Sequence, residues 1–543
     1  MFMIFAIGLA VRLIALINLE IINPDGVLYI FQAKAVANGQ WHLLNQCQLH
    51  FFSLYPVLVA VFWWVLSDWV LSAQLVSLLL GFGTLLILYR LLRLYIDAAT
   101  AQLTILLYTM LPLMVRYSVD AMRDATFWFF FTAAIWLFIL HTIPNFKKDA
   151  SLGLLAGSSF LILLAAWTRI EGIILLPVAC LYMAVAGGER KWLRLLIFLL
   201  PPAFLGGLMA LVAKHQNIDL FSLIRLSDVV YKFHAPIDTY QDLRMQLKSI
   251  GLLSNDNLLR EFMPNARNTI WLIALGTILR SAMEAFYYPY VPIFAAGFIF
   301  TLRQRERRRA FGFLLTIIGF SFLLLYTHVL QTWIMTYRFA ILLIIPSCLP
   351  AGVGMQKTID FTEKIFNLSR PQSMALIAAF IVGTSLAKNV SPFESDKAVY
   401  RQISATIKNT LPDAPVVIIS GRPSTIHLWV LFYANVATLQ PVCHCSYTVD
   451  ARSMPELLAQ MKSQGSVYLL WESSAWQDAA FGRSIAEFQN TFEQVGHWRH
   501  QDAGDLFLLR RKAVCPPHAP MKPTCGKYLR CPPPKPDKLV DRG

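Results

Sequence analysis

The feature that most constrains this chain is a series of apolar runs, each long enough to cross a lipid bilayer as a helix. A helix needs about 20 apolar residues to cross the hydrocarbon core. The 543 residues are 56% hydrophobic and only 15% charged, whereas soluble proteins carry about 25% charged residues. We therefore expect a polytopic α-helical membrane protein. Its expected spans, about eleven, lie near 2–19, 71–92, 98–115, 124–141, 151–168, 170–187, 193–213, 284–302, 310–330, 335–355 and 372–388.

Two apolar segments near the N-terminus need separate interpretation. The run at 2–19 has neither a polar leading region nor a small-residue cleavage site, so we expect a retained span. The piece at 51–66 is short, rich in aromatic residues and followed by Ser67 and Asp68. Such a segment suits a helix that lies at the membrane interface.

The distribution of lysine and arginine predicts the orientation, because these cations stay on the cytoplasmic side. Alternate connections hold fifteen of them, including the run at 303–309, and the opposite short loops hold four. We therefore expect a protein of the plasma (inner) membrane with a cytoplasmic N-terminus. An odd number of spans then places the C-terminus on the external or periplasmic side.

This orientation divides the chain into three parts. Residues 1–388 form the transmembrane domain, whose external loops are 20–70 and 214–283. Residues 389–512 contain a helical pattern and three short strand patterns, so we expect a small external α/β domain. The tail at 513–543 is rich in proline and lysine and is expected to be disordered.

The composition also excludes some ligands. The formal net charge is +15, but the basic residues cluster between apolar runs, which favours membrane anchoring and argues against nucleic acid. The eight cysteines form no C-x-x-C framework. No metal ligand and no cofactor is predicted, although Asp120 or Asp124 leaves a divalent cation open.

The stretch "NPDGVLYIFQAKAVANG" at 23–39 follows the first span and contains an unexplained carboxylate. Asn23 suits a helix N-cap, Pro24 the first helical position and Gly39 a helix end, so we expect a short external helix at 24–38. Asp25 then lies in the first turn, with Tyr29 on the same face. The simplest interpretation is that Asp25 only complements the helix dipole.

Further polar groups follow or precede spans at the same expected face. Singly, each is more often a solvated interfacial charge. Their gathering on one face favours a binding site. These candidates are Arg116, Asp120, Arg123, Asp124, Arg169, Glu171, His328, Tyr337 and Arg338.

Carboxylates and arginines at the outer leaflet suit the chemistry of a lipid-linked phosphate. Arginines would hold the phosphate and stabilise its charge as it leaves, and a carboxylate would accept the proton of an attacking hydroxyl or amine. Glycosyl transfer from a polyprenyl-phosphate sugar is such a reaction. We therefore expect this donor as a partner, with a lipid, glycan or protein acceptor and membrane lipid around the chain.

Several segments resemble the GT-C glycosyltransferases, which include protein O-mannosyltransferases and lipid A aminoarabinose transferases. "NPDGVLYIFQAKAVANGQW" resembles their first external loop, "TRIEGIILLP" at 168–177 their TRPEG turn, and "YRFAILLIIPSCLPAGVG" at 337–354 a late span. The resemblance covers about residues 1–388. It implies an inverting transferase in which Asp25 is the general base, loop 214–283 covers the donor, and Tyr29, Lys34 and the candidates above contact substrate.

The chain departs from this pattern at two points, and two other functions stay open. His50 to Leu54 replaces the usual basic residue and paired prolines, and the first loop has one acid where protein O-mannosyltransferases have two. A polytopic transporter would also carry charges within its membrane domain. A lipid-linked oligosaccharide ligase or polymerase would have a similar hydropathy profile.

Overall fold

The computed structural model describes residues 1–44, 51–143, 148–186, 190–215, 226–410, 418–420, 426–439, 447–448, 458–459, 461, 468–472, 491–501 and 504–512. The chain divides into two compact units. The bundle unit comprises Met1–Leu16, Ser53–Tyr55 and Gln74–Ser391, and the mixed unit comprises Ile17–Phe52, Pro56–Ala73 and Pro392–Gly543. The predicted tail at 513–543 lies outside the described residues.

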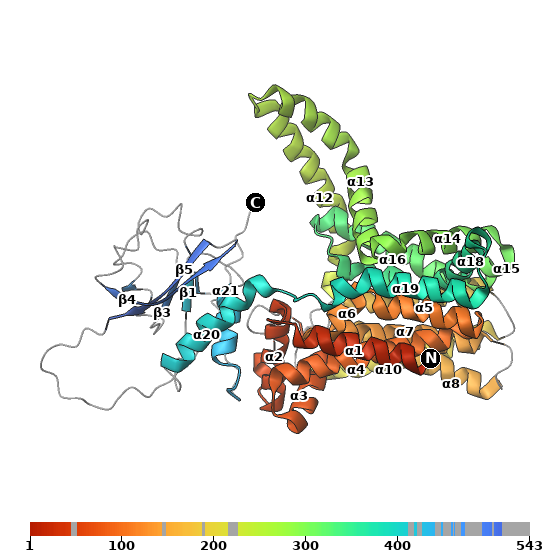
Figure 1. The fold of residues 1–543 in the computed structure, drawn as a ribbon, viewed down its shortest axis with the longest axis horizontal. Helices are drawn as coiled ribbons and strands as arrows, with labels where there is room; N and C mark the ends of the chain where they lie inside the picture. Colours follow the sequence, from red (N-terminus) through yellow and green to blue (C-terminus); the bar gives the residue numbers. More distant parts are fainter. Residues whose placement is uncertain are drawn as a thin grey trace, which may run out of the picture. The chain divides into compact units, whose positions relative to one another are not determined.

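The bundle unit consists of helices, most of which run along a common direction (Figure 1). The helices before the centre of the chain are α1 (Phe2–Ile17), α4 (Trp69–Leu92), α5 (Ala98–Met110), α6 (Pro112–Val119), α7 (Asp124–Thr142), α8 (Lys148–Thr168), α9 (Leu175–Ala186) and α10 (Lys191–His215). The later ones are α12 (Leu226–Leu253), α13 (Asn257–Ala285), α14 (Val291–Arg303), α15 (Arg305–Ala310), α16 (Gly312–Thr332), α17 (Ile341–Ile344), α18 (Cys348–Phe366) and α19 (Arg370–Val390).

The expected number of eleven spans stays a prediction. Among the described residues, six helices are long and apolar enough to cross a membrane, and three bent helix pairs raise this number to at most nine. The segments expected at 2–19 and 170–187 form shorter apolar helices. The expected spans at 98–115, 284–302 and 335–355 are broken by bends of 57°, 91° and 79°.

Local sequence explains these breaks. Pro112 follows Leu111, the C-cap of α5, and has no N–H to donate, so the helix cannot continue through it. Pro346 lies in the gap between α17 and α18. Tyr287, with a φ of 63°, turns the chain between α13 and α14 and precedes the short η3 helix (Tyr288–Tyr290). A hydropathy window averages over such breaks, so it predicts continuous spans.

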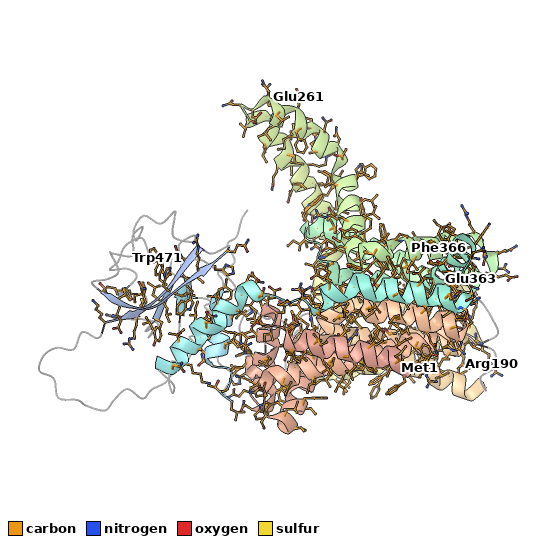
Figure 2. The ribbon with its side chains drawn as sticks, in the orientation of Figure 1. Met1, Arg190, Glu261, Glu363, Phe366 and Trp471 are labelled. Atoms are coloured by element: carbon orange, nitrogen blue, oxygen red, sulfur yellow. The ribbon has the colours of Figure 1, made fainter. Side chains whose placement is uncertain are left out.

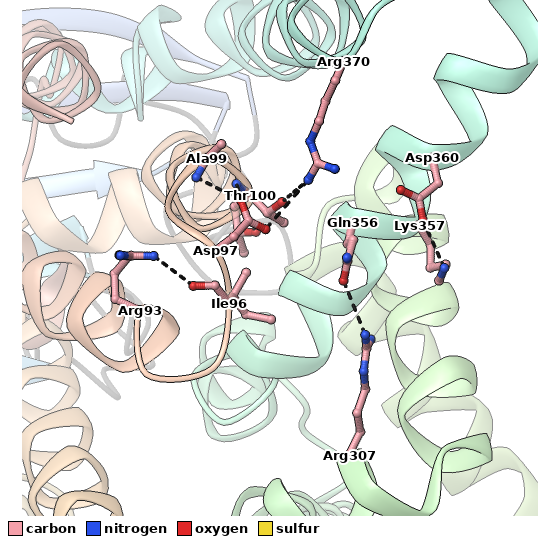
Figure 3. A network of polar contacts seen from close by, with 11 residues as sticks. Arg93, Ile96, Asp97, Ala99, Thr100, Arg307, Gln356, Lys357, Asp360 and Arg370 are labelled. Carbon is pink, nitrogen blue, oxygen red and sulfur yellow. Dashed lines mark hydrogen bonds and ion pairs between the residues drawn. The ribbon is translucent and has the colours of Figure 1, made fainter.

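Polar contacts join several connections between the helices (Figure 3). Asp97 caps α5 by accepting hydrogen bonds from the N–H groups of Ala99 and Thr100, and Arg370 lies 3.8 Å from the Asp97 carboxylate. In Figure 1 the N-terminus and the basic α15 lie toward the same end of the bundle. This arrangement agrees with the expectation that both lie on the cytoplasmic side of the membrane. The orientation of the protein in the membrane stays a prediction.

The expected loop at 214–283 contains two long helices. α12 and α13 form a hairpin that projects from the bundle unit, with Glu261 near its tip (Figure 2). Tyr326 of α16 donates to the carbonyl of Trp271 at 3.1 Å, which ties the base of the hairpin to the bundle. Ala274, Ile278 and Val329 form a buried apolar cluster there.

The mixed unit combines N-terminal helices with a C-terminal sheet. Its helices are α2 (Pro24–Ala37), α3 (Leu54–Leu66), α20 (Ala398–Thr410) and α21 (Ile426–Ala434). Its strands are β1 (Ile418–Ser420), β2 (Tyr447–Thr448), β3 (Tyr468–Glu472), β4 (Phe492–His500) and β5 (Gly504–Arg511). The sheet order is β2-β1-β3-β5-β4, with β1 parallel to β2 and β3, and β5 antiparallel to β3 and β4.

These elements agree with most of the expected local structure. The predicted helix at 24–38 is α2, the piece expected at the interface forms α3, and the three predicted strand segments overlap β1, β3 and β5. Strands β2 and β4 were not expected. The small C-terminal sheet is therefore confirmed, and its external position stays a prediction.

Candidate active site

The helix that carries Asp25 begins as its sequence requires. The Asn23 side chain accepts a hydrogen bond from the Asp25 N–H at 3.0 Å, and Pro24 occupies the first turn. The Asp25 side chain is half-buried and Tyr29 is buried. Asp25 therefore lies in the first turn of α2, at the positive end of the helix dipole.

The segment around α2 is held by the C-terminal part of the mixed unit. Trp429 of α21 donates to the carbonyl of Ile22 at 2.8 Å, and the Ile22 N–H donates to the Tyr433 hydroxyl at 3.0 Å. Arg401 of α20 donates to the carbonyl of Glu20 at 2.9 Å. Residues more than 370 positions away thus fix the chain that leads into the Asp25 helix.

Lys34, an expected substrate contact, is buried in the same unit. Its ammonium group donates to the carbonyls of Val436 at 3.1 Å and Asn435 at 3.4 Å, and lies 5.7 Å from the centre of the Trp69 ring. Burial lowers the pKa of Lys34 to about 8. In this arrangement the side chain ties α2 to the residues after α21, and a substrate role stays a prediction.

The other nine candidates belong to the bundle unit, at the ends of α6, α8 and α16 and at the starts of α7, η2 (Ile170–Ile174) and η4 (Tyr337–Ala340). Arg116 donates to the Tyr337 hydroxyl at 3.1 Å, and the Tyr117 and Tyr337 rings lie 5.9 Å apart. This joins the segment after the α5–α6 break to η4, 221 residues later.

Arg169 is the centre of a buried ion-pair cluster. Its guanidinium donates to the Asp124 carboxylate and lies 3.3 Å from Glu171. Asp124 and Arg169 are 1% and 5% exposed. Arg123 donates to the carbonyl of Thr168 at 3.2 Å, so the start of α7 and the end of α8 are joined twice.

The turn after Arg169 depends on its glycine. A Cβ atom at Gly172 would lie 2.8 Å from backbone atoms of Ala165 and Ala166, closer than real contacts allow. The absence of a side chain lets η2 pack directly against the end of α8. This contact explains the glycine of the "TRIEG" segment.

Phe339, which the sequence analysis missed, joins this cluster to η4. The Arg169 guanidinium lies 5.0 Å from the centre of its ring, the Arg338 guanidinium 5.5 Å and the His328 ring 5.1 Å. An aromatic face can hold cations close together because its ring carries negative charge on each face. Phe339 thereby connects three of the expected residues.

Asp120 follows α6 and is buried, and its carboxylate accepts the Ala121 N–H at 2.7 Å. The cluster as a whole contains four arginines, which are Arg116, Arg123, Arg169 and Arg338, and three carboxylates, which are Asp120, Asp124 and Glu171. The arginines exceed the acids, so the cluster has the net positive charge that an anionic ligand requires.

Arg12 and Asn389 support this cluster from within the bundle, and the sequence analysis missed both. Arg12 of α1 is fully buried and donates to the carbonyl of Thr109 and the hydroxyl of Ser118, each at 3.0 Å. Asn389 donates to the carbonyl of Met110 at 2.8 Å. Both carbonyls lie at the end of α5, where Pro112 interrupts the helix. The signal for Arg12 was a lone arginine inside an apolar span.

Among the described residues, no group of three His, Cys, Asp or Glu side chains is arranged to hold a metal ion. Asp25, Tyr29 and Lys34 belong to the mixed unit and the other candidates to the bundle unit.

Comparisons with known proteins agree with the architecture. The family model described as dolichyl-phosphate-mannose-protein mannosyltransferase matches residues 54–214. No curated protein sequence matches the chain. The structure is similar to that of ArnT from Cupriavidus metallidurans bound to undecaprenyl phosphate, with 12% identity, a TM-score of 0.58, and coverage of 95% of this chain and 99% of ArnT.

A second similar structure is the Archaeoglobus fulgidus oligosaccharyltransferase AglB in complex with an inhibitory peptide and a dolichol-phosphate. Its identity is 11%, its TM-score 0.52, and the match covers 95% of this chain and 74% of AglB. At these identities the matches establish a shared fold. The resemblance to the GT-C fold is thereby confirmed, and the apolar helices together with these matches support an integral membrane protein.

Proposed function

We propose that this chain, an integral membrane protein with the fold of GT-C glycosyltransferases, transfers a sugar from a polyprenyl-phosphate donor to a lipid, glycan or protein acceptor on the external face. The observation that carries the proposal is the cluster of four arginines and three carboxylates in the bundle unit. The undecaprenyl phosphate in the ArnT structure and the dolichol-phosphate in the AglB structure support a lipid phosphate as the donor carrier.

The proposed reaction breaks the bond between the sugar and the phosphate. A hydroxyl or amine of the acceptor attacks the anomeric carbon from the face opposite the phosphate and forms a new bond with inversion. The polyprenyl phosphate leaves with the bonding electron pair. The proton of the nucleophile passes to the Asp25 carboxylate, so that atoms and charge balance.

The arginine cluster suits this reaction because the charge of the phosphate grows as it leaves. The phosphodiester donor carries one negative charge, and the phosphomonoester product carries about −1.5 to −2 at neutral pH. Cations that surround this group therefore stabilise the transition state more than the bound donor. We assign phosphate contact to Arg116, Arg123 and Arg338, and support of the site to Arg169, which binds Asp124 and Glu171.

A transporter would share one feature of this chain, the broken helix α5–α6 within the bundle. The buried Arg12 beside that break donates to backbone carbonyls and a hydroxyl. These contacts suit a fixed support of the break better than a group that releases and rebinds a substrate. The GT-C fold also favours the transferase.

The experiment that tests the proposal compares host cells with and without this protein. Polyprenyl-phosphate sugars are extracted and identified by mass spectrometry. We expect one of them to accumulate when the protein is absent and to return to its normal level when the wild-type gene is restored. An unchanged set of lipid-linked sugars would contradict the proposal.

A further inference from the structure

The α12–α13 hairpin ends in a group of exposed apolar side chains. Leu252, Leu253 and Leu258 are 75%, 82% and 76% exposed, and Phe262 is 57% exposed. All four lie within eleven residues around the turn between α12 and α13, and Figure 2 labels Glu261 at this tip. Exposed apolar side chains grouped in this way mark a surface that an apolar partner, a protein or a membrane, covers.

The direction of the hairpin identifies this partner. α13 meets the segment formed by η3 and α14 at 91°. α14 runs in the direction of α19 and α5 in the bundle (Figure 1), and its Gly297 packs so closely on α18 that a Cβ atom would lie 2.0 Å from the carbonyl oxygen of Pro350. A helix at right angles to bundle helices that cross the bilayer lies along the plane of the membrane.

The depth of α13 follows from the length of α14. The 13 residues of α14 rise about 20 Å along the helix axis. α14 ends next to the basic run of α15, which marks one membrane interface, and the hydrocarbon core is about 30 Å thick. α14 thus crosses more than half of the core, so α13 leaves the bundle in the opposite leaflet.

The charges of the hairpin agree with this position. Between residues 238 and 268 it carries four acidic and four basic residues, so charge provides no net attraction to an anionic or cationic partner. At 100° per residue, Leu258 and Phe262 lie on one face of α13 and Arg260 lies on the opposite face. One face is thus suited to acyl chains and the other to water.

We propose that the α12–α13 hairpin lies on the bilayer opposite the basic α15 end of the bundle, with Leu258 and Phe262 in the boundary between head groups and acyl chains. The partner is the lipid surface itself. The hairpin then anchors the bundle beside the arginine cluster, because η4, which carries Tyr337 and Arg338, contacts α13. This proposal does not depend on the proposed reaction.

Spin labels test the position directly. Phe262→Cys and, as a matched control on the same turn, Arg260→Cys are each labelled with a nitroxide in a background whose other cysteines are replaced by serine. Both proteins are reconstituted in nanodiscs of phosphatidylcholine with one copy per disc. Collision rates with oxygen, which concentrates in lipid, and with a water-soluble nickel chelate are measured.

We expect the label at 262 to collide with oxygen and to lose collisions with the nickel chelate, and the label at 260 to show the reverse. Leu258→Cys gives a second measurement on the lipid face if the variant at 262 does not fold. Nickel collisions at both 258 and 262 would overturn the proposal. Protection from both reagents would also overturn it, because a protein surface would then cover the patch.

Discussion

The buried ion pair between Arg169 and Asp124 gives the sharpest prediction of stability. The change Arg169→Leu leaves the Asp124 carboxylate in a position that is 1% exposed. The Oδ2 atom of Asp124 accepts no hydrogen bond from the described residues, so Arg169 is the main group that stabilises the negative charge of this carboxylate. Removing one member of a buried pair costs about 3–5 kcal/mol, a large part of a typical stability of about 5–15 kcal/mol.

Two other losses accompany this change, and both are smaller. The contact between Arg169 and the Phe339 ring is worth up to about 2 kcal/mol. Glu171 is 19% exposed, so water partly replaces its lost partner. The stranded Asp124 charge therefore dominates, and we expect a clear fall in the thermal unfolding temperature of the protein purified in detergent.

A double variant separates this cause from general damage. Arg169→Leu combined with Asp124→Leu removes both charges, which is often neutral for a buried pair. We expect the double variant to be more stable than Arg169→Leu alone. Arg305→Leu, in the exposed helix α15, serves as the control and should change the unfolding temperature little. If the double variant is no more stable than Arg169→Leu, the stranded charge is not the cause.

Three further predictions concern other parts of the chain. Asn389→Leu removes the hydrogen bond to the buried Met110 carbonyl and should lower the free energy of unfolding, measured with denaturant, by about 1–3 kcal/mol. Unchanged stability would contradict the capping role of Asn389. Folding lowers the pKa of Lys34 from 10.5 to about 8, so the unfolded state binds more protons than the folded state between these pH values. The free energy of unfolding should therefore rise from pH 8 to 10.5. The variant Lys34→Met should remove this dependence on pH. Arg123→Ala should reduce transfer from the donor about tenfold or more, because a charge-assisted hydrogen bond worth about 1.5–3 kcal/mol is lost. Arg305→Ala serves as the control and should not reduce it. If both variants behave alike in a titration with donor, Arg123 does not contact the phosphate.

Local sequence signals predicted the elements that depend on neighbouring residues. Asn23 and Pro24 set the start of α2, and the apolar runs set the positions of most bundle helices. Charged residues next to these runs identified the members of the cluster around Arg169. In each case the determining residues lie within a few positions of the structure that they produce.

Contacts between distant segments could not be predicted in this way. Arg12 donates to the Thr109 carbonyl, at the end of α5 before Pro112 and about 100 positions later, and Trp429 donates to the chain before α2 from the other end of the sequence. Phe339 looked like one apolar residue among many, because its role comes from the cations around its ring. Such roles arise only when the tertiary structure brings the partners together.

The proposed reaction also depends on Asp25 as the general base. Asp25 is half-buried at the start of α2, a position that suits both a dipole-complementing residue and a proton acceptor. Only a measurement of transfer distinguishes the two. The binding of the lipid carrier must be measured beside it, because a folded but inactive protein is the expected result.

The most direct test uses purified wild type and Asp25→Asn in proteoliposomes that contain the accumulated polyprenyl-phosphate sugar, labelled in its sugar, together with acceptor extracted from the host. Release of label from the lipid carrier and binding of undecaprenyl phosphate are measured on the same samples. We predict that Asp25→Asn lowers the transfer rate by about 10²–10⁴ and leaves binding of undecaprenyl phosphate unchanged. Transfer by Asp25→Asn at the wild-type rate would contradict the assignment of Asp25 as the base, and absence of transfer by the wild-type protein would contradict the proposed function.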